Sequence, residues 1–168
     1  MVDDGLLTKL TVEPCLLFQQ REKSLLVVTQ GKTVGLTDER LNRGGMQIIK
    51  RDAMKMHQLT QNTFILSAGM YADYQKFWSV MDDSLRNYQQ NHNTTLSSTS
   101  IASLVSRVLY GKRFFPFYSF NVVAGFDDSD EPAIWGYDAI GSYGRAIYQV
   151  TGSGKEFFLP FLDQQVHL

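Results

Sequence analysis

Short runs of β-branched and apolar residues dominate the first 70 positions and predict strands. The runs at 24–29 and 33–37 flank a brief turn that contains a glycine, which indicates a β-hairpin. Three further runs predict strands at 46–50, 55–59 and 63–69. The first part of the chain is therefore expected to hold five strands.

The middle of the chain changes to a helical period. Apolar positions recur at steps of three and four along one predicted helix, namely Tyr74, Phe77, Trp78, Met81, Leu85 and Tyr88. A second helix is expected to begin near residues 97–99, whose hydroxyl side chains are favourable caps, and to bury Ile101, Leu104, Val105, Val108 and Leu109. Gly111 stands where a cap glycine belongs, and Lys112 and Arg113 follow near the negative end of the helix dipole.

The last third of the chain returns to strands and ends in a helix. Residues 117–128 predict a long buried strand, and residues 133–138 and 145–150 predict two more, with an acidic turn at 127–132. A third helix is expected near Lys155–Gln165. Because strands and helices are segregated along the chain rather than alternating, the order predicts an α+β fold with layered sheets.

Composition narrows the class of protein. The 168 residues are 43% hydrophobic and 12% aromatic, which is typical of one globular domain with a real core. The net charge of −1 disfavours a general nucleic-acid binder, which usually carries a basic excess. The single cysteine, Cys15, excludes an internal disulfide or a CxxC metal pair and fits a reducing compartment. We expect neither a secretory signal nor a membrane span, since no apolar run approaches about 20 residues.

Several local patterns suggest chemistry, but each is incomplete. The acidic run 127–131 has the early spacing of a calcium loop but lacks its glycine and its final glutamate, so a solvated hairpin tip is favoured. The segment 151–156 resembles the end of a phosphate loop, yet Glu156 replaces the hydroxyl residue and Thr151 fails the nucleophile-elbow pattern. The histidines are scattered without a metal-binding motif, at His57, His92 and His167.

The run "VLYGKRFFPFYSF", residues 108–120, joins a helix end, two cations and a set of aromatic residues. It could serve as a nucleic-acid platform, as a membrane anchor, or as a helix end that feeds a buried strand. A platform for single strands needs exposed rings beside cations. Because these rings lie at a strand start after a capped helix, packing in the core or in an interface is favoured.

Several stretches, taken in order, resemble a β-type subunit of the proteasome core particle: "LTDER", "RDAMKMHQLT", "SAGMYADY", "VLYGKRFFPFY", "VVAGFDD", "YDAIGSYGR", "VTGSG" and "PFLDQQV". The motifs "LYGKRFFPFY", "DAIGSYGR" and "PFLDQQV" resemble more narrowly the non-catalytic subunit at the sixth position of the β ring. The resemblance covers residues 24–168 as a single domain and leaves 1–23 as an atypical N-terminal extension. It implies the αββα four-layer sandwich of N-terminal-nucleophile hydrolases, shortened at the C-terminus.

Active members of that family cut peptides with a processed N-terminal threonine whose free amine and a nearby lysine activate the hydroxyl. The motif positions of the family correspond here to Asp38, Arg40, Lys55, Gly69 and Ser153. The nucleophile position falls near Glu22 or Lys23, and no Gly-Thr, Gly-Ser or Gly-Cys dipeptide precedes the first strand. We therefore expect no catalytic residue, and interpret Asp38, Arg40 and Lys55 as a structural ion-pair set.

The resemblance implies a non-catalytic structural subunit of the 20S core particle, which encloses the chamber for ubiquitin-dependent proteolysis in cytoplasm and nucleus. No cofactor or metal is expected. The implied partners are neighbouring β-type subunits, α-type subunits of the adjacent ring and β-type subunits across the ring–ring interface, but no nucleic acid or membrane. Expected interface residues are Lys112, Arg113, Phe114, Phe115, Phe117, Tyr118, Tyr143, Arg145, Phe161, Asp163 and Gln165. The alternatives are an active peptidase processed before Ser24, or a small aromatic and basic binding module.

Overall fold

The computed structural model describes residues 53–152 and 154–165, preceded by four strands at 23–29, 32–37, 41–43 and 47–50. In chain order, the elements of these parts are β1 (Lys23–Thr29), β2 (Lys32–Thr37), β3 (Leu41–Arg43), β4 (Gln47–Lys50), β5 (Met56–Thr60), β6 (Thr63–Gly69), α1 (Tyr71–His92), α2 (Ser98–Tyr110), β7 (Ser119–Phe126), β8 (Pro132–Tyr137), β9 (Tyr143–Ala146), β10 (Gln149–Gly152) and α3 (Lys155–Gln165). The predicted order of strands, two helices, strands and one helix is confirmed.

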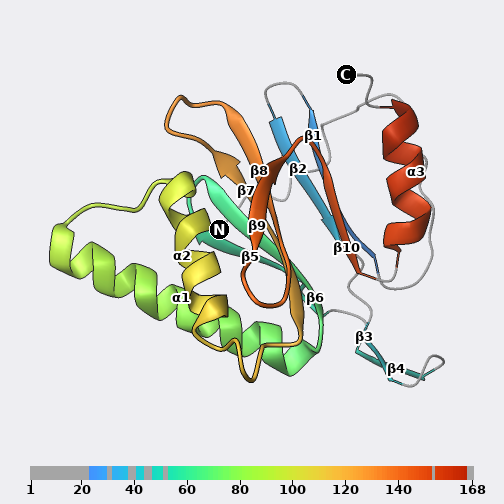
Figure 1. The fold of residues 1–168 in the computed structure, drawn as a ribbon, viewed down its shortest axis with the longest axis horizontal. Helices are drawn as coiled ribbons and strands as arrows, with labels where there is room; N and C mark the ends of the chain where they lie inside the picture. The colour runs from blue at the N-terminus through green and yellow to red at the C-terminus, as the bar shows by residue number, and fades with distance from the viewer. Residues whose placement is uncertain are drawn as a thin grey trace.

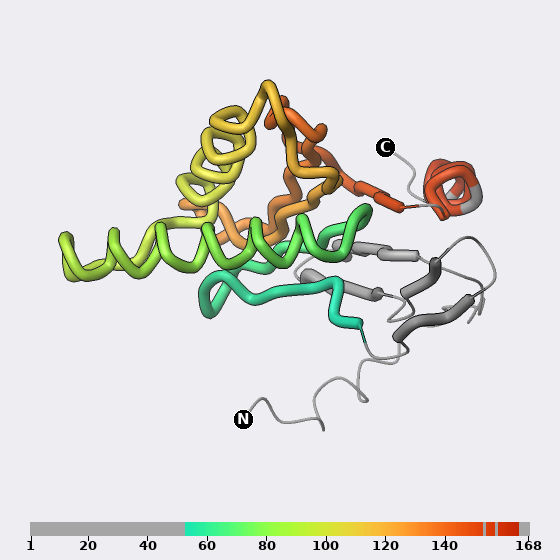
Figure 2. The backbone as a smooth tube through the Cα atoms, turned by 90° about the horizontal axis from the view of Figure 1, so that it is seen from below, coloured from blue at the N-terminus to red at the C-terminus, as the bar shows by residue number. Residues whose placement is uncertain are grey.

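Two antiparallel sheets lie face to face between helices (Figure 1). One has the order β5-β6-β7-β8-β9 and the other β10-β1-β2, while β3 and β4 form a separate pair. Strands β1 and β10 contact β6 and β8, so the two sheets pack on each other. Helices α1 and α2 contact the five-stranded sheet, whereas α3 contacts β10. Figure 2 shows α3 well apart from α1 and α2. The described chain is thus an α+β sandwich with the expected αββα layers.

Alternation along the central strands divides the interior into two cores. Ile65 of β6 packs with residues of α1 and α2, whereas the next residue, Leu66, packs on the opposite face of the sheet. Val123 and Val122 of β7 divide in the same way. Neighbouring side chains of a strand point to opposite faces. A sheet that is covered on both faces therefore needs apolar residues at consecutive positions, as these strands have.

Helix α1 buries the stripe that its periodicity predicted. Tyr74, Phe77, Trp78 and Met81 are buried against the sheet. Burial of each large apolar side chain contributes roughly 1.5–3 kcal/mol, and this stripe fixes the helix on β5 and β6. The helix ends at Asn93, whose left-handed backbone (φ 50°) lets its N–H donate to the Gln89 carbonyl at 2.8 Å.

Helix α2 begins at the predicted hydroxyl residues. The Ser97 side chain accepts a hydrogen bond from the Ser100 backbone N–H at 3.4 Å, which caps the first turn. Gly111 is the C-cap, as expected, but its φ of −58° is helical, so the position does not use the left-handed conformation that favours glycine. The chain continues in tight turns, in which Lys112 N–H donates to the Leu109 carbonyl and Arg113 N–H to the Tyr110 carbonyl, each at 3.0 Å.

The prediction of a single strand at 145–150 was wrong. Strand β9 ends at Ala146 and pairs with β8, whereas β10 begins at Gln149 and pairs with β1 in the other sheet. The chain crosses from one sheet to the other at Ile147 and Tyr148. Hydrophobic alternation cannot show this change, because both halves keep the same period of two.

Two other strand predictions needed correction. The strand expected at 117–128 begins only at Ser119, because the Tyr118 N–H donates to the Asp73 carboxylate at 2.8 Å instead of joining the ladder. It ends at Phe126, where Asp127 begins a turn. The three-residue strand β3 was not predicted, since it is too short to show a period.

Candidate functional site

The candidate site lies where strand β1 begins. The antiparallel register sets Lys23 opposite Gly152 and Ser24 opposite Thr151 at the end of β10. The Thr151 hydroxyl donates to the Phe120 carbonyl of β7 at 3.4 Å, which links this corner to the five-stranded sheet. Ser153 follows β10 directly, and Ser153, Asp38 and Arg40 lie outside the described residues. The beginning of β1 thus meets the end of β10 and the beginning of β7.

Lys55 is brought to the same end of the five-stranded sheet. It precedes β5, and its backbone carbonyl accepts the Ser67 N–H of β6 at 2.9 Å. Only 7% of Lys55 is exposed. Lysine is almost never buried to this extent unless it is paired. A paired, buried lysine fits an active site of the family, and it fits a structural ion pair equally well. The burial of Lys55 alone therefore does not make it a catalytic residue.

Gly69 ends β6 and approaches the backbone of β7 closely. Its φ is +117°, and a Cβ atom there would lie 2.5 Å from the Tyr118 carbonyl oxygen. That same oxygen accepts the N–H of the next residue, Met70, at 2.8 Å. Backbone geometry therefore requires glycine at this motif position whether or not the site catalyses a reaction.

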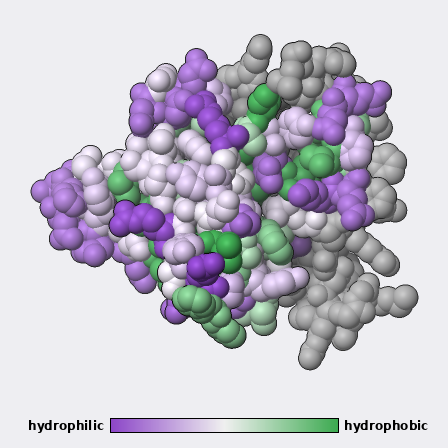
Figure 3. Space-filling model, viewed as in Figure 1, coloured by the Kyte–Doolittle hydropathy of each residue, from purple (hydrophilic) through white to green (hydrophobic). Residues whose placement is uncertain are grey.

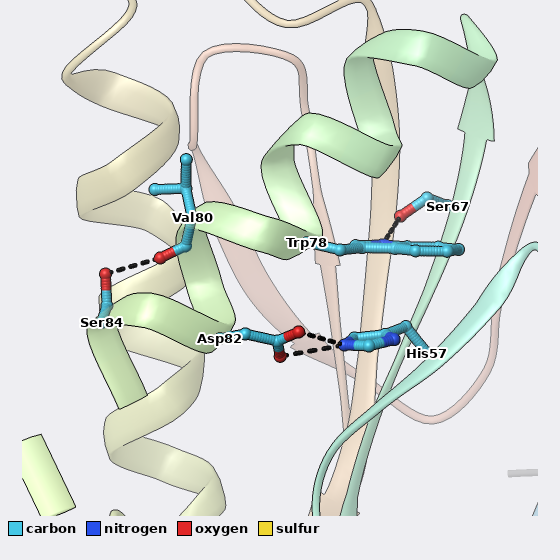
Figure 4. A network of polar contacts seen from close by, with 6 residues as sticks. All are labelled: His57, Ser67, Trp78, Val80, Asp82 and Ser84. Atoms are coloured by element: carbon cyan, nitrogen blue, oxygen red, sulfur yellow. Dashed lines mark hydrogen bonds and ion pairs between the residues drawn. The ribbon is translucent and has the colours of Figure 1, made fainter. Parts of the chain in front are cut away.

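A buried polar network that the sequence did not reveal crosses the helix-facing core (Figure 4). The Trp78 indole N–H donates to the Ser67 hydroxyl at 2.9 Å, and that hydroxyl donates to the Asn121 side-chain oxygen at 2.6 Å. The His57 ring stacks on Trp78 with centroids 5.2 Å apart. His57 Nε2 also contacts the Asp82 carboxylate at 2.9 Å.

This network contains serine, histidine and aspartate, but it is not a hydrolase triad. The indole of Trp78 lies between His57 and Ser67, and Figure 4 shows the two rings stacked in parallel. The Ser67 hydroxyl is fully buried and engaged on both sides. A triad needs the imidazole within hydrogen-bond reach of the nucleophile. The arrangement instead satisfies buried polar groups and ties α1 to β5 and β6.

The acidic tip between β7 and β8 is closed by its own hydrogen bonds. The Asp127 carboxylate accepts the Glu131 N–H at 3.0 Å and the Ser129 N–H at 2.9 Å, and it pairs with Arg145 at 3.0 Å. The hydrogen bond from Glu131, together with those from Ser129 and Arg145, lowers the pKa of Asp127. In the described parts of the chain, no group of three or more His, Cys, Asp or Glu could hold a metal ion.

The aromatic run after α2 divides into one partly buried ring and several exposed rings. Phe117 packs against the core, with its ring 5.6 Å from that of Phe77. Phe114 and Phe115 are 97% and 89% exposed, and Tyr118 is also exposed. Packing in the core is therefore wrong for Phe114 and Phe115, because they lie exposed in the turn before β7, whereas packing in an interface stays a prediction. Lys112 and Arg113 are exposed beside them.

Three other expected interface residues have partners within this chain. The Tyr143 ring stacks on Tyr137 at 5.2 Å, and its hydroxyl lies 3.0 Å from that of Ser103. Arg145 pairs with Asp127 as described above. Asp163 of α3 accepts a hydrogen bond from the Tyr148 hydroxyl, which raises the pKa of that tyrosine.

The last two expected interface residues lie on α3. Phe161 is 46% exposed, and Gln165 is the last residue of the helix. Leu162, next to Phe161, is buried. In the described parts of the chain, no helix is long and apolar enough to cross a membrane.

The layers and strand order define the class as an α+β sandwich of the N-terminal-nucleophile hydrolase type. Residues 25–167 match the family described as "Proteasome subunit". Proteasome subunit beta type-1 of Dictyostelium discoideum is 40% identical over 129 residues, which cover 77% of this chain and 55% of that protein. The chain belongs to the proteasome subunit family.

Further relatives carry β-type names as well. Proteasome subunit beta type-1 of Arabidopsis thaliana is 40% identical over 122 residues, covering 73% of this chain and 55% of that protein. Probable proteasome subunit beta type-6 of Schizosaccharomyces pombe is 36% identical over 124 residues, covering 74% and 55%. The chain spans about half the length of the relatives it matches.

Proposed function

We propose that this chain is a non-catalytic β-type subunit of the proteasome core particle, which helps to build the β ring around the proteolytic chamber. The observation that carries the proposal is which residues stand at the start of β1. The register sets Lys23 opposite Gly152 at the corner where the family places its nucleophile. Neither Glu22 nor Lys23 has a hydroxyl or thiol, so the family's lysine has nothing to activate there.

The remaining motif positions are compatible with a purely structural role. The backbone of Gly69 requires a glycine for steric reasons. Lys55 is buried, as a lysine in an ion-pair set would be. On this proposal, Asp38, Arg40 and Lys55 form a structural ion-pair set and do not act on peptides.

We assign the chain to the sixth position of the β ring. The assignment rests on the motifs "LYGKRFFPFY", "DAIGSYGR" and "PFLDQQV". Relatives are named beta type-1 or beta type-6, and these names do not by themselves assign a ring position. The proposed partners are flanking β-type subunits, α-type subunits of the adjacent ring and β-type subunits of the facing ring. The proposed location is the cytoplasm and nucleus.

The test is the native mass of the complex that contains this chain in its own cells, with peptidase activity assayed before and after a threonine-directed inhibitor. We expect a particle tens of times heavier than the 19.1 kDa chain, with inhibitor-sensitive activity and with this chain unlabelled by the inhibitor. A free monomer would overturn the assignment to the particle and favour a small binding module. Inhibitor bound to this chain would overturn the non-catalytic role.

One observation favours a second candidate function. Ser24 lies near the start of β1 opposite Thr151, so cleavage after Lys23 would expose a serine with a free amine. The chain would then be an active N-terminal-nucleophile peptidase. Intact-mass measurement on the purified particle distinguishes the two, since only the active form requires an N-terminus at Ser24.

A further inference from the structure

The turn between α2 and β7 exposes two neighbouring phenylalanines. We call residues 110–118 the aromatic turn. Phe114 and Phe115 are 97% and 89% exposed, more than any other large hydrophobic residue in the described parts of the chain. Figure 3 shows hydrophobic side chains beside strongly hydrophilic ones at the lower edge of the molecule, where this turn lies in Figure 1.

Contacts within the described chain support both ends of the aromatic turn. The Phe115 N–H donates to the Lys112 carbonyl at 3.0 Å, which continues the tight turns that follow α2. Beyond it, Phe117 is anchored on Phe77 of α1, and the Tyr118 N–H donates to Asp73 at 2.8 Å. Because both ends of the turn are supported, binding a partner costs less backbone entropy, and the main ordering cost is that of the exposed Phe114 and Phe115 side chains.

The aromatic turn exposes two cations, Lys112 and Arg113, in a chain whose net charge is −1, and the Asp73 carboxylate of α1 is bonded to its Tyr118 N–H. Residues 107–126 include three cations and no carboxylate. The Arg113 guanidinium lies 5.6 Å from the Tyr110 ring centre and 5.8 Å from that of Phe114. The cation and the rings therefore form one amphipathic surface, which suits an apolar pocket with an acidic rim.

Two other classes of partner fit this surface less well. Recruitment to an anionic membrane uses clusters of about four to eight Lys or Arg, whereas the turn exposes Lys112 and Arg113. Single-stranded nucleic acid needs a positive groove that follows its backbone as well as stacking rings. The aromatic turn is a protruding turn and not a groove. Its Arg113 already lies over the Tyr110 and Phe114 rings, where bases would have to stack.

We propose that the aromatic turn inserts Phe114 and Phe115 into an apolar, carboxylate-rimmed pocket on one neighbouring β-type subunit. This inference rests on the proposed role as a ring subunit. It adds which residues of this chain contact the neighbouring subunit and what kind of pocket they enter there. Aromatic residues and Arg are the commonest interface anchors. Tyr143, Arg145 and Asp163 already have partners within the chain. Phe114 and Phe115 are more exposed than Phe161, which makes them the most exposed apolar anchors among the expected interface residues that the structure describes.

The first experiment maps the contact in the assembled particle. The photo-reactive residue p-benzoylphenylalanine is placed at position 114 or 115 of the tagged full chain in its own cells, and the particle is isolated by mass and peptidase activity. We expect a crosslink to one other β-type subunit, within a peptide that contains Asp or Glu. The matched control places the probe at Ile147, a 55% exposed apolar residue, and should not label that peptide.

The second experiment tests the chemistry with competing variants. In cells that also make the wild-type chain, Phe114→Ser with Phe115→Ser should lower the share of tagged chain in the particle roughly thirtyfold, as expected for loss of a hot spot. Lys112→Glu with Arg113→Glu should also lower it, and reversing the crosslinked carboxylates on the partner should restore it. Lys155→Glu, an exposed cation on α3, serves as the charge control.

The possible outcomes distinguish failure of the proposed contact from failure of the chain to assemble into the particle. An assembled chain whose probe labels no subunit would overturn the inference and leave the proposed function standing. Labelling of a second copy, a lipid or a nucleic acid would overturn it as well. A chain found in no particle overturns both proposals. Circular dichroism of the purified serine variant should match wild type, because both phenylalanines are exposed, so loss of assembly cannot be attributed to unfolding.

Discussion

At the scale of single residues, Gly69 and Ser67 show how local geometry fixes residue identity near the candidate site. Gly69 combines a φ of +117° with close approach to the Tyr118 carbonyl. Ser67, two positions earlier, satisfies both the Trp78 indole and the Asn121 amide inside the core. Neither requirement depends on catalysis, so each can be tested by its effect on stability.

We predict that Gly69→Ala destabilises the chain by about 1–3 kcal/mol, because a non-glycine residue is strained at this φ and its Cβ meets the Tyr118 carbonyl. Urea unfolding followed by tryptophan fluorescence measures the change. The control is Gly144→Ala in β9, where a Cβ would meet nothing within 4 Å. Equal stability of the two variants would contradict the prediction.

Replacing Ser67 by alanine should cost about 1–3 kcal/mol of unfolding free energy, because it leaves the Trp78 N–H and the Asn121 oxygen buried without their shared partner. Ser79→Ala, on the exposed side of α1, is the control and should be neutral or slightly stabilising. Chemical denaturation of both variants measures the difference in their unfolding free energies. A Ser67 variant as stable as the Ser79 variant would show that the network contributes little.

At the scale of elements, the β7–β8 tip shows a titratable group that closes a turn. The Asp127 carboxylate accepts two backbone N–H groups and joins Arg145 of β9. These contacts favour its charged form, so its pKa in the folded chain lies below the ordinary value of about 4. The stability that Asp127 contributes is present above its unfolded pKa and is lost as the pH falls through the folded pKa.

The stability difference between wild type and Asp127→Ala should therefore be largest at neutral pH and should shrink as the pH falls below about 4. Urea midpoints measured from pH 7 into the acid range test this direction. Asp128→Ala removes a carboxylate from the same turn without touching the contacts of Asp127, so it serves as the matched control. A difference that grows on acidification would have the wrong sign for a depressed pKa.

Sequence patterns predicted an element correctly where the whole element has the same packing partners along its length. The stripe of α1 and the Ser97 cap of α2 are local features, and both predictions are confirmed. The division of 145–150 between two sheets was missed, because the partners of β9 and β10 are distant in sequence. The network of His57, Trp78 and Ser67 was missed for the same reason.

At the scale of the whole molecule, the two sheets meet at one corner, where β1 begins, β10 ends and β7 begins. Strand β10 returns from the last part of the chain to pair with β1, and Thr151 links that pair to Phe120 of β7. The proposal of a non-catalytic subunit rests on the residues at this corner, because neither Glu22 nor Lys23 has a hydroxyl or thiol. The two candidate functions differ in whether Ser24 reacts.

We predict that Ser24→Ala leaves every inhibitor-sensitive peptidase activity of the particle unchanged, since a structural subunit supplies no nucleophile. Activity is measured per assembled particle with peptides of different specificity, and a silent substitution in the same strand is the control. Selective loss of one activity, with normal assembly, would identify Ser24 as a nucleophile.

The sequence by itself determined the class of fold, the family resemblance and the identity of the residues at the start of the first strand, because these depend on local periodicity and on short motifs read in order. Tertiary structure decided which residues meet. It packed Phe117 against the core and left Phe114 exposed, although both belong to one aromatic run. It also gave Arg145 a partner within the chain. The physical reason is that burial and pairing depend on elements far away in sequence, whose positions are fixed only when the sheets and helices pack together.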